Sequence, residues 1–142
     1  MYHFTLKATF PFSVTHLFDA FHKPDLLMQW FAPGDVQITQ VMSNFAEGGR
    51  YRVSMMEPSG DSYSLTGQFA TILANEELVF SWAWEDNREE SVITSVDIKF
   101  EALGPNLSSV HLLHSGFMNK TERDQHQLGW VDCLEKLSQL KF

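Results

Sequence analysis

The chain has 142 residues, which is enough for one compact domain and too short for two. Hydrophobic residues make up 44% and charged residues 20% of it, which excludes collagen-like, low-complexity and wholly disordered chains. The net charge of −8 is not offset by a cluster of basic residues, so no nucleic-acid partner is expected.

The N-terminal segment predicts one strand followed by two short helices. Apolar and polar residues alternate from Tyr2 to Phe10, which is the period of a half-buried strand. Apolar residues then recur at helical spacing over Val14–His22, with Ser13 as the N-cap. Pro24 is suited to the first turn of a helix, so a second helix is expected over Asp25–Phe31.

The middle of the chain predicts six strands separated by short turns that are rich in Gly, Pro, Asn and acidic residues. Short turns make neighbouring strands antiparallel, so a meander is the simplest topology. One of the turns is expected at Asp86–Glu90. The predicted strands are Val36–Ala46, Arg50–Glu57, Ser62–Leu73, Leu78–Glu85, Ser91–Glu101 and Ser108–Ser115.

The last segment, Thr121–Leu140, predicts a long amphipathic helix with His126, Trp130 and Leu134 on its apolar side. The order of elements predicts an α+β fold: a curved seven-stranded antiparallel sheet wrapped around the C-terminal helix, with two short helices after the first strand. The whole chain, residues 1–142, forms one domain in this prediction. Because a twisted sheet of this size curls, one straight helix leaves space on its concave side, where we expect a ligand cavity.

Motifs in a fixed order along nearly the whole chain carry a resemblance to a known family. They are Ser13–Phe21, Pro24–Leu26, Trp30–Pro33, Glu47–Arg52, Leu65–Phe69, Leu78–Trp82, Leu113–Phe117, and His126 with Gly129, Trp130 and Leu134. With these motifs the chain resembles the homologues of the activator of heat-shock protein 90 ATPase. That family lies within the helix-grip superfamily of START-related, birch-pollen-allergen-like and polyketide-cyclase-like domains. The resemblance implies a helix-grip fold and a hydrophobic cavity, and the family's name suggests a chaperone partner and a role in stress response.

Strand parity and the resemblance together define the candidate ligand-binding residues. Alternate residues of a strand share one face, so the aromatic residues at alternate positions of the predicted strands line the cavity, and Val92 is expected on the same face. The alternative is that these side chains only form the core. The candidates are Trp30, Tyr51, Met55, Phe69, Trp82, Trp84, His114, Phe117, His126, Trp130 and Leu134.

Three functions are compatible with this pattern. The prediction adopted is binding of a small hydrophobic or aromatic molecule, without a catalytic residue. The second is a cyclase- or hydrolase-like enzyme in which an inward-facing His114, with Tyr51 or Tyr63, moves a proton, against the alternative that His114 is a satisfied core histidine. The third is a module that meets a chaperone through its exposed sheet face or acidic turns.

No metal or cofactor is expected. Glu122 and His126 lie four residues apart on one helix face, but no third ligand has a recognisable spacing, and His111 and His114 point to opposite faces of a strand. Cys133 lies two helical turns from His126, about 10 Å along the axis, so it is interpreted as a small buried hydrophobe rather than a nucleophile.

A lone cysteine cannot form an internal disulfide bond, which favours a reducing compartment. The first residues have neither the basic start nor the apolar run of a signal peptide, and the apolar stretches are too short to span a membrane. We therefore expect a cytoplasmic protein, a monomer or homodimer, without a membrane partner. Gly129, between His126 and Trp130, is expected to permit a close approach to the last helix.

Overall fold

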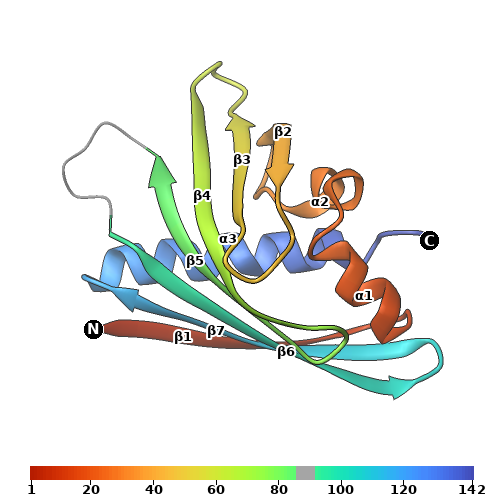
Figure 1. Cartoon of the computed structure of the whole chain (residues 1–142). Coiled ribbons are helices and arrows are strands. Elements are labelled where there is room, and N and C mark those ends of the chain that lie inside the picture. The colour runs from red at the N-terminus through yellow and green to blue at the C-terminus, as the bar shows by residue number, and fades with distance from the viewer. Residues whose placement is uncertain (86–91) are drawn as a thin grey trace.

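A computed structural model describes residues 1–85 and 92–142, which form a seven-stranded antiparallel sheet and three helices (Figure 1). The strands follow one another in space in the order β1-β7-β6-β5-β4-β3-β2. The elements are β1 (Tyr2–Phe10), α1 (Val14–Ala20), α2 (Pro24–Trp30), β2 (Gln37–Ser43), β3 (Arg50–Met56), β4 (Ser62–Leu73), β5 (Glu77–Glu85), β6 (Thr94–Gly104), β7 (Leu107–Phe117) and α3 (Lys120–Leu137).

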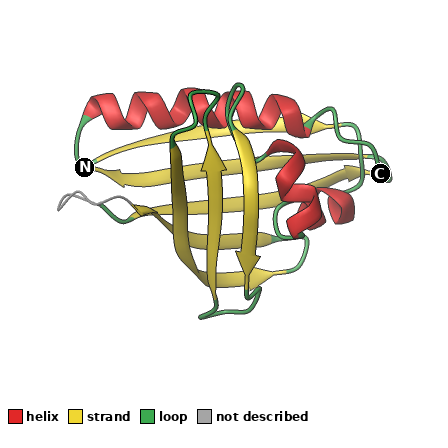
Figure 2. Cartoon of the chain, turned by 90° about the horizontal axis from the view of Figure 1, so that it is seen from above, coloured by secondary structure: helices red, strands yellow, loops and turns green. Residues whose placement is uncertain are grey.

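The sheet confirms the predicted meander, because β2 to β7 are each paired with the next strand along the chain. β1 is added beside β7, with Phe4 opposite His114. Figure 1 shows β1, β6 and β7 running along α3 while β2, β3 and β4 stand across it, and Figure 2 shows the same bend from above. Register shifts in β2 and in β4, the latter between Phe69 and Thr71, lie in the strands that bend, as bulges increase local twist.

Each helix begins at a residue suited to that position. The Ser13 hydroxyl accepts a hydrogen bond from the His16 backbone N–H at 3.1 Å, which caps α1 as predicted. Pro24 occupies the first turn of α2, where its missing N–H costs nothing. The Asn119 side chain accepts from the Glu122 N–H at 2.8 Å and caps α3.

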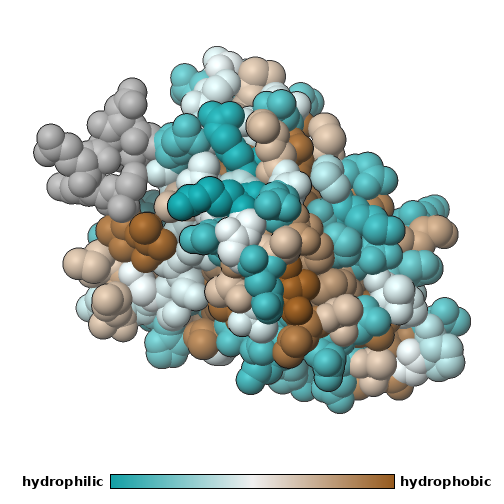
Figure 3. Space-filling model, viewed as in Figure 1, coloured by the Kyte–Doolittle hydropathy of each residue, from teal (hydrophilic) through white to brown (hydrophobic). Residues whose placement is uncertain are grey.

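The core lies between the concave face of the sheet and the helices. Alternate strand residues such as Val53, Leu65 and Ile98 are buried, and α3 buries Trp130, Cys133, Leu134 and Leu137 against them. On the face seen in Figure 3, apolar side chains gather in separate small areas among hydrophilic ones. The fold class and the helix-grip architecture implied by the resemblance are therefore confirmed.

Some sequence predictions need correction. Val92 does not face the cavity: it precedes β6 and is 40% exposed, because the strand begins only at Thr94. Gly129 does not permit a close approach, since a Cβ built there would meet no atom within 4 Å. α3 ends at Leu137 rather than Leu140. The predicted turn at Asp86–Glu90 and the predicted strand start at Ser91 lie outside the described residues.

Candidate functional site

Six of the predicted ligand-binding side chains lie together where β5 and β7 face α3. We call this set the aromatic cluster: Trp82, Trp84, His114, Phe117, His126 and Trp130. The ring of Trp82 is at its centre, with centroids 5.0 Å from His114, 5.5 Å from Trp130 and 5.7 Å from Trp84. Trp82 and Trp84 meet α3 because alternate residues of β5 point to the same face.

Phe117 joins the aromatic cluster through a backbone irregularity. Its position in β7 is odd relative to His114, so simple alternation would direct its side chain outward. The register between β1 and β7 shifts at this point, and Gly116 takes a φ of 99°, a conformation that favours glycine. Phe117 is consequently buried, and its ring centroid lies 4.5 Å from that of His114 and 4.9 Å from that of His126.

His114 is fully buried, and both of its ring nitrogens have partners. The Trp130 indole donates to Nδ1 at 3.1 Å, and because an indole N–H can only donate, Nδ1 carries no proton. The proton is then on Nε2, which donates to the Thr94 hydroxyl at 2.7 Å, and that hydroxyl donates to the Trp82 carbonyl at 3.3 Å. Burial lowers the pKa of His114 to about 3, and the nearby His126 adds to this shift. His114 is therefore neutral at physiological pH.

His126 repeats this arrangement on the other side of the aromatic cluster. The Trp84 indole donates to Nε2 of His126 at 2.9 Å, which leaves the proton on Nδ1, and Nδ1 donates to the Glu122 carbonyl at 2.7 Å. The two Trp–His pairs run in opposite directions, since the sheet supplies the donor in one and α3 supplies it in the other. Together they connect β5 and β7 to α3 by side-chain hydrogen bonds.

Trp82 differs from its neighbours in its hydrogen bonding. Its side chain is 7% exposed, and its Nε1 has no hydrogen-bond partner among the residues that the structure describes. Thr94, by contrast, uses its hydroxyl twice, toward His114 and toward the Trp82 carbonyl. The aromatic cluster thus contains one buried donor that is left for another group.

A second feature of the concave face is a half-open apolar cavity of about 30 Å³ between the two short helices and the strands β2 to β5. A volume of this size holds one or two water molecules, well below the several hundred Å³ of a typical ligand pocket. Tyr51 and Phe69 are the predicted ligand-binding residues that line it. The full lining is Phe21, His22, Leu27, Phe31, Val41, Ser43, Tyr51, Val53, Phe69 and Phe80.

The Tyr51 hydroxyl does not point to a place where it could transfer a proton, because the protein itself supplies its partner. It donates to the Ser81 carbonyl at 2.6 Å, and burial raises its pKa above the ordinary value. The ring crosses over Gly67, where a Cβ would lie 2.4 Å from the Tyr51 ring and 2.0 Å from the Ser81 oxygen. Only glycine fits at that position of the Leu65–Phe69 motif.

Phe31 connects the cavity to the aromatic cluster. Its side chain lines the cavity, and its ring packs edge-on against Trp82 and Trp130 with centroids 5.8 and 5.7 Å away. The segment that follows it is tied to α3, because Lys136 Nζ donates to the carbonyls of Ala32 and Gly34 at 2.6 Å each. The Asp132 carboxylate accepts from the Gly34 N–H as well.

The remaining predicted residues are buried at other places. Trp30 belongs to α2, where its indole donates to the Ala20 carbonyl at 3.0 Å and so joins the two short helices. Met55 on β3 and Leu134 on α3 are part of the buried core. Cys133 is buried too, and burial raises the pKa of its thiol to about 12, which agrees with its interpretation as a small hydrophobe.

Sequence reasoning missed two residues of the site. Thr94 orients His114, and it has the same strand parity as Val96, so a polar residue on an apolar face was the available signal. Phe31 separates the cavity from Trp82, but the sequence places it only at the end of the second predicted helix. Phe31 follows the end of α2, and the direction of its side chain there depends on tertiary packing, which the local sequence pattern does not predict.

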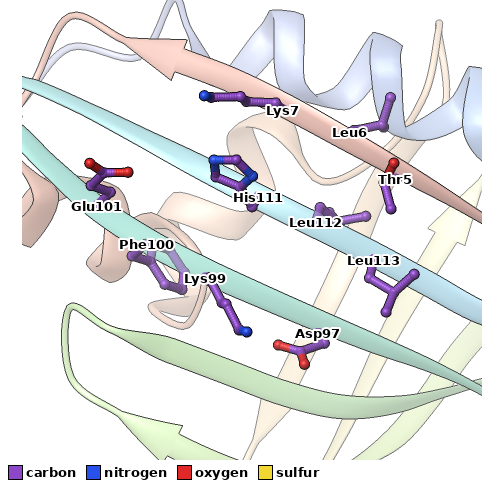
Figure 4. Close-up of a pocket in the computed structure, with 10 residues that line it drawn as sticks. All are labelled: Thr5, Leu6, Lys7, Asp97, Lys99, Phe100, Glu101, His111, Leu112 and Leu113. Carbon is purple, nitrogen blue, oxygen red and sulfur yellow. The ribbon is translucent and has the colours of Figure 1, made fainter.

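The outer face of the sheet carries an open, shallow depression over β1, β6 and β7, of about 620 Å³ (Figure 4). It is lined by side chains of both charges, with Lys7 and Lys99 near Asp97 and Glu101. His111 lies on this face while His114 is buried on the other, as the strand parity predicted. Mixed charge on an exposed sheet face is typical of solvated surface, so we place the candidate site on the concave side.

Metal ligation has no geometric basis within residues 1–85 and 92–142, where no three His, Cys, Asp or Glu side chains are grouped. Glu122 Oε2 lies 4.0 Å from His126 Nδ1, and both nitrogens of that imidazole are already hydrogen-bonded. Among the described segments, none of the helices has the combination of length and hydropathy that crossing a bilayer requires.

The chain matches one family model and is similar to several solved structures. The family model described as "Activator of Hsp90 ATPase homolog 1-like protein" matches residues 11–141. Among solved structures, protein CV1439 from Chromobacterium violaceum has a TM-score of 0.87 at 17% identity, with 96% of this chain and 94% of that chain covered. The AHSA1 protein SPO3351 from Silicibacter pomeroyi has a TM-score of 0.86 at 22% identity, with coverage of 96% and 95%.

A further structural neighbour, DynU16, is described as a putative protein in the dynemicin biosynthetic locus. Its TM-score is 0.73 at 18% identity, and the alignment covers 96% of this chain and 45% of that one. These similarities extend the fold assignment to almost the whole chain. A search of the curated proteins gave no match.

Proposed function

Because the chain belongs to the family of Activator of Hsp90 ATPase homolog 1-like proteins, we propose that it binds a small hydrophobic or aromatic molecule on the concave face of its sheet. The ligand would lie between the sheet, α2 and α3. The observation that carries this proposal is the half-open apolar cavity, which is lined by four phenylalanines and one tyrosine and adjoins the aromatic cluster at Phe31.

The small volume of the cavity determines how binding would proceed. About 30 Å³ does not admit an aromatic molecule, so binding requires that Phe31 leave its place between the cavity and Trp82. Phe31 is the C-cap of α2, a helix of seven residues, and such a short helix is held mainly by its tertiary contacts. A shift of Phe31 would extend the cavity toward Trp82 and Trp130 and create a larger apolar pocket.

The contacts of His114 support binding rather than proton transfer. A general base must present an acceptor to its substrate, whereas Nδ1 of His114 is occupied by Trp130 and Nε2 by Thr94. The Tyr51 hydroxyl is bonded to the Ser81 carbonyl, and burial raises the pKa of Tyr63. We therefore retain binding as the proposed function.

A cavity-filling substitution tests this proposal. Val41 lines the cavity from β2, and Val41→Phe adds a ring to it, while Met42→Phe adds one to the outward face of the same strand, where Met42 is 55% exposed. Wild-type protein and both variants are titrated with fatty acids, sterols and polycyclic aromatic molecules, with binding measured by native mass spectrometry and calorimetry.

We expect wild type and Met42→Phe to bind a common member of this panel, and Val41→Phe to bind it at least about tenfold more weakly, the loss expected when a ligand must displace a buried ring. Binding of no member by wild type would contradict the proposal. So would equal affinity of the wild type and Val41→Phe.

A further inference from the structure

We propose, on the basis of the proposed function, that the ligand carries a neutral hydrogen-bond acceptor, such as a ketone, amide or ether oxygen, which pairs with Nε1 of Trp82. The ligand class is then an apolar or aromatic molecule with one such oxygen, rather than a plain hydrocarbon or a carboxylic acid. Three observations carry this: the hydrogen bonding of the four indoles, the position of Trp82 beside the cavity, and the absence of any counter-charge among the lining residues.

The first observation is that Trp82 is the exception among the four tryptophans. The indole of Trp30 donates to the Ala20 carbonyl, that of Trp84 to His126 and that of Trp130 to His114, at 2.9 to 3.1 Å. Nε1 of Trp82 is shielded from water but has no partner within the described residues. Buried indole N–H groups usually have a hydrogen-bond partner, so this one is suited to an acceptor that the protein itself does not supply.

The second observation is that Trp82 packs against Phe31, a residue that lines the cavity. Phe80, two residues earlier on the same face of β5, lines the cavity, and so does Phe31, whose ring contacts Trp82. A ligand that takes the place of the Phe31 ring therefore meets Trp82 directly. The acceptor would be at the inner end of the ligand, and its apolar part would occupy the cavity beside Tyr51 and Phe69.

The third observation concerns charge and the acceptors already in use. Among residues 1–85 and 92–142, neither Lys nor Arg lines the cavity, and the aromatic cluster contains none. His22, the titratable side chain with a basic form on the cavity wall, is paired with Asp19 at 3.4 Å, and burial lowers its pKa. A carboxylate at Trp82 would lose its hydration without gaining a cation, which disfavours an anionic ligand.

Hydroxyl-rich ligands are disfavoured for a related reason. The acceptor nitrogens of His114 and His126 are already used by Trp130 and Trp84, so a ligand hydroxyl placed there would have to break one of these bonds to donate its proton. Within the described residues of the aromatic cluster, Nε1 of Trp82 is therefore the free buried donor, and it selects for an acceptor.

A matched pair of probes tests this inference. 2-Acetylnaphthalene and 2-isopropenylnaphthalene have nearly the same shape, and only the first carries a carbonyl oxygen. Calorimetry measures their affinities for wild type, Trp82→Phe and Trp30→Phe. The last variant is the control, because it removes an indole that is bonded to the Ala20 carbonyl.

We expect the ratio of the two affinities to favour the ketone by about tenfold more in wild type than in Trp82→Phe, as one neutral hydrogen bond of ordinary strength gives. Trp30→Phe should keep the wild-type ratio, and 2-naphthoate should bind more weakly than the ketone. If Trp82→Phe does not fold, the indole proton of Trp82 in wild type is followed by NMR, and it should shift with the ketone much more than with the hydrocarbon.

The outcomes separate this inference from the proposed function. If both naphthalenes bind but the ratio is the same in wild type and Trp82→Phe, or the indole proton responds equally to both, the inference is wrong and the proposed function stands. If neither naphthalene binds wild type, the inference is contradicted, and the proposed function is contradicted as well only if no fatty acid, sterol or polycyclic aromatic molecule of the earlier panel binds.

Discussion

The indole of Trp130 on α3 donates its N–H to Nδ1 of His114 on β7 at 3.1 Å, in the fully buried interior of the protein. This bond and the one between Trp84 and His126 connect the helix to the sheet at two places. A buried polar link of this kind is stabilising only while both partners are present, because either one left alone is an unsatisfied group in an apolar environment.

Replacement of His114 by Leu should therefore destabilise the protein strongly. The change leaves the Trp130 N–H and the Thr94 hydroxyl without their partner, and we expect the free energy of unfolding to fall by roughly 2–4 kcal/mol. Urea denaturation measures this. His111→Leu on the outer face of the same strand is the control and should change stability by less than about 0.5 kcal/mol. Equal effects of the two variants would mean that the hydrogen bonds of His114 do not matter.

The same histidine should make stability depend on pH. The pKa of His114 is lowered to about 3 in the folded state, below its value of 6.5 in an unfolded chain, so the unfolded state takes up a proton first as the pH falls. The stabilisation is complete above pH 6.5 and is lost progressively toward pH 3, by roughly 1 kcal/mol for each pH unit. The difference in unfolding free energy between wild type and His114→Leu should shrink between about pH 7 and pH 4. A constant difference would contradict the prediction.

The hydrogen bonds from Lys136 to the segment after α2 should limit the mobility of Phe31. Lys136→Met keeps the aliphatic stem but removes the bonds to the carbonyls of Ala32 and Gly34, and we expect the amide hydrogens of Phe31, Ala32 and Gly34 to exchange about tenfold faster. Hydrogen exchange followed by mass spectrometry measures this. Lys120→Met, at the exposed first turn of α3, is the control and should leave that segment unchanged. Unaltered exchange in Lys136→Met would show that other contacts hold Phe31 in place.

Two glycines offer a pair of substitutions with opposite effects. Gly67→Ala places a methyl group 2.0 Å from the Ser81 oxygen and 2.4 Å from the Tyr51 ring, so the backbone of β4 and β5 must separate, at a cost of roughly 3 kcal/mol or more. Gly129→Ala in α3 meets no atom within 4 Å and should add about 0.5–1 kcal/mol through helix propensity. Thermal unfolding compares the two variants with wild type, and a loss of stability in Gly129→Ala would show that its surroundings are tighter than the structure indicates.

Much of the fold could be predicted from periodicity alone. The alternation along β5 placed Trp82 and Trp84 on the face that meets α3, and the same rule separated His111 from His114, because a strand leaves no other choice of face. Where the backbone departs from that period, the rule fails. Phe117 faces inward only because the strand is irregular at Gly116, and the parity rule could not place it.

The size of the cavity and the hydrogen-bond partners of the aromatic side chains could not be predicted from the sequence. Both depend on how close-packed side chains share a limited volume, and the ring of Phe31 occupies space that the concave sheet would otherwise leave open. The partner of each indole is likewise a matter of rotamers and tertiary distances. The sequence could show that four tryptophans were present, but not that one of them would be left without an acceptor.

Because three indoles lie where α3 meets the sheet, the intrinsic tryptophan fluorescence of the protein also reports on this site. Trp82, Trp84 and Trp130 lie close enough to exchange excitation energy, and two of them donate hydrogen bonds to imidazoles. The intrinsic fluorescence of the chain therefore originates mostly from the proposed ligand site. Ligand binding can be followed by this fluorescence in the unlabelled protein.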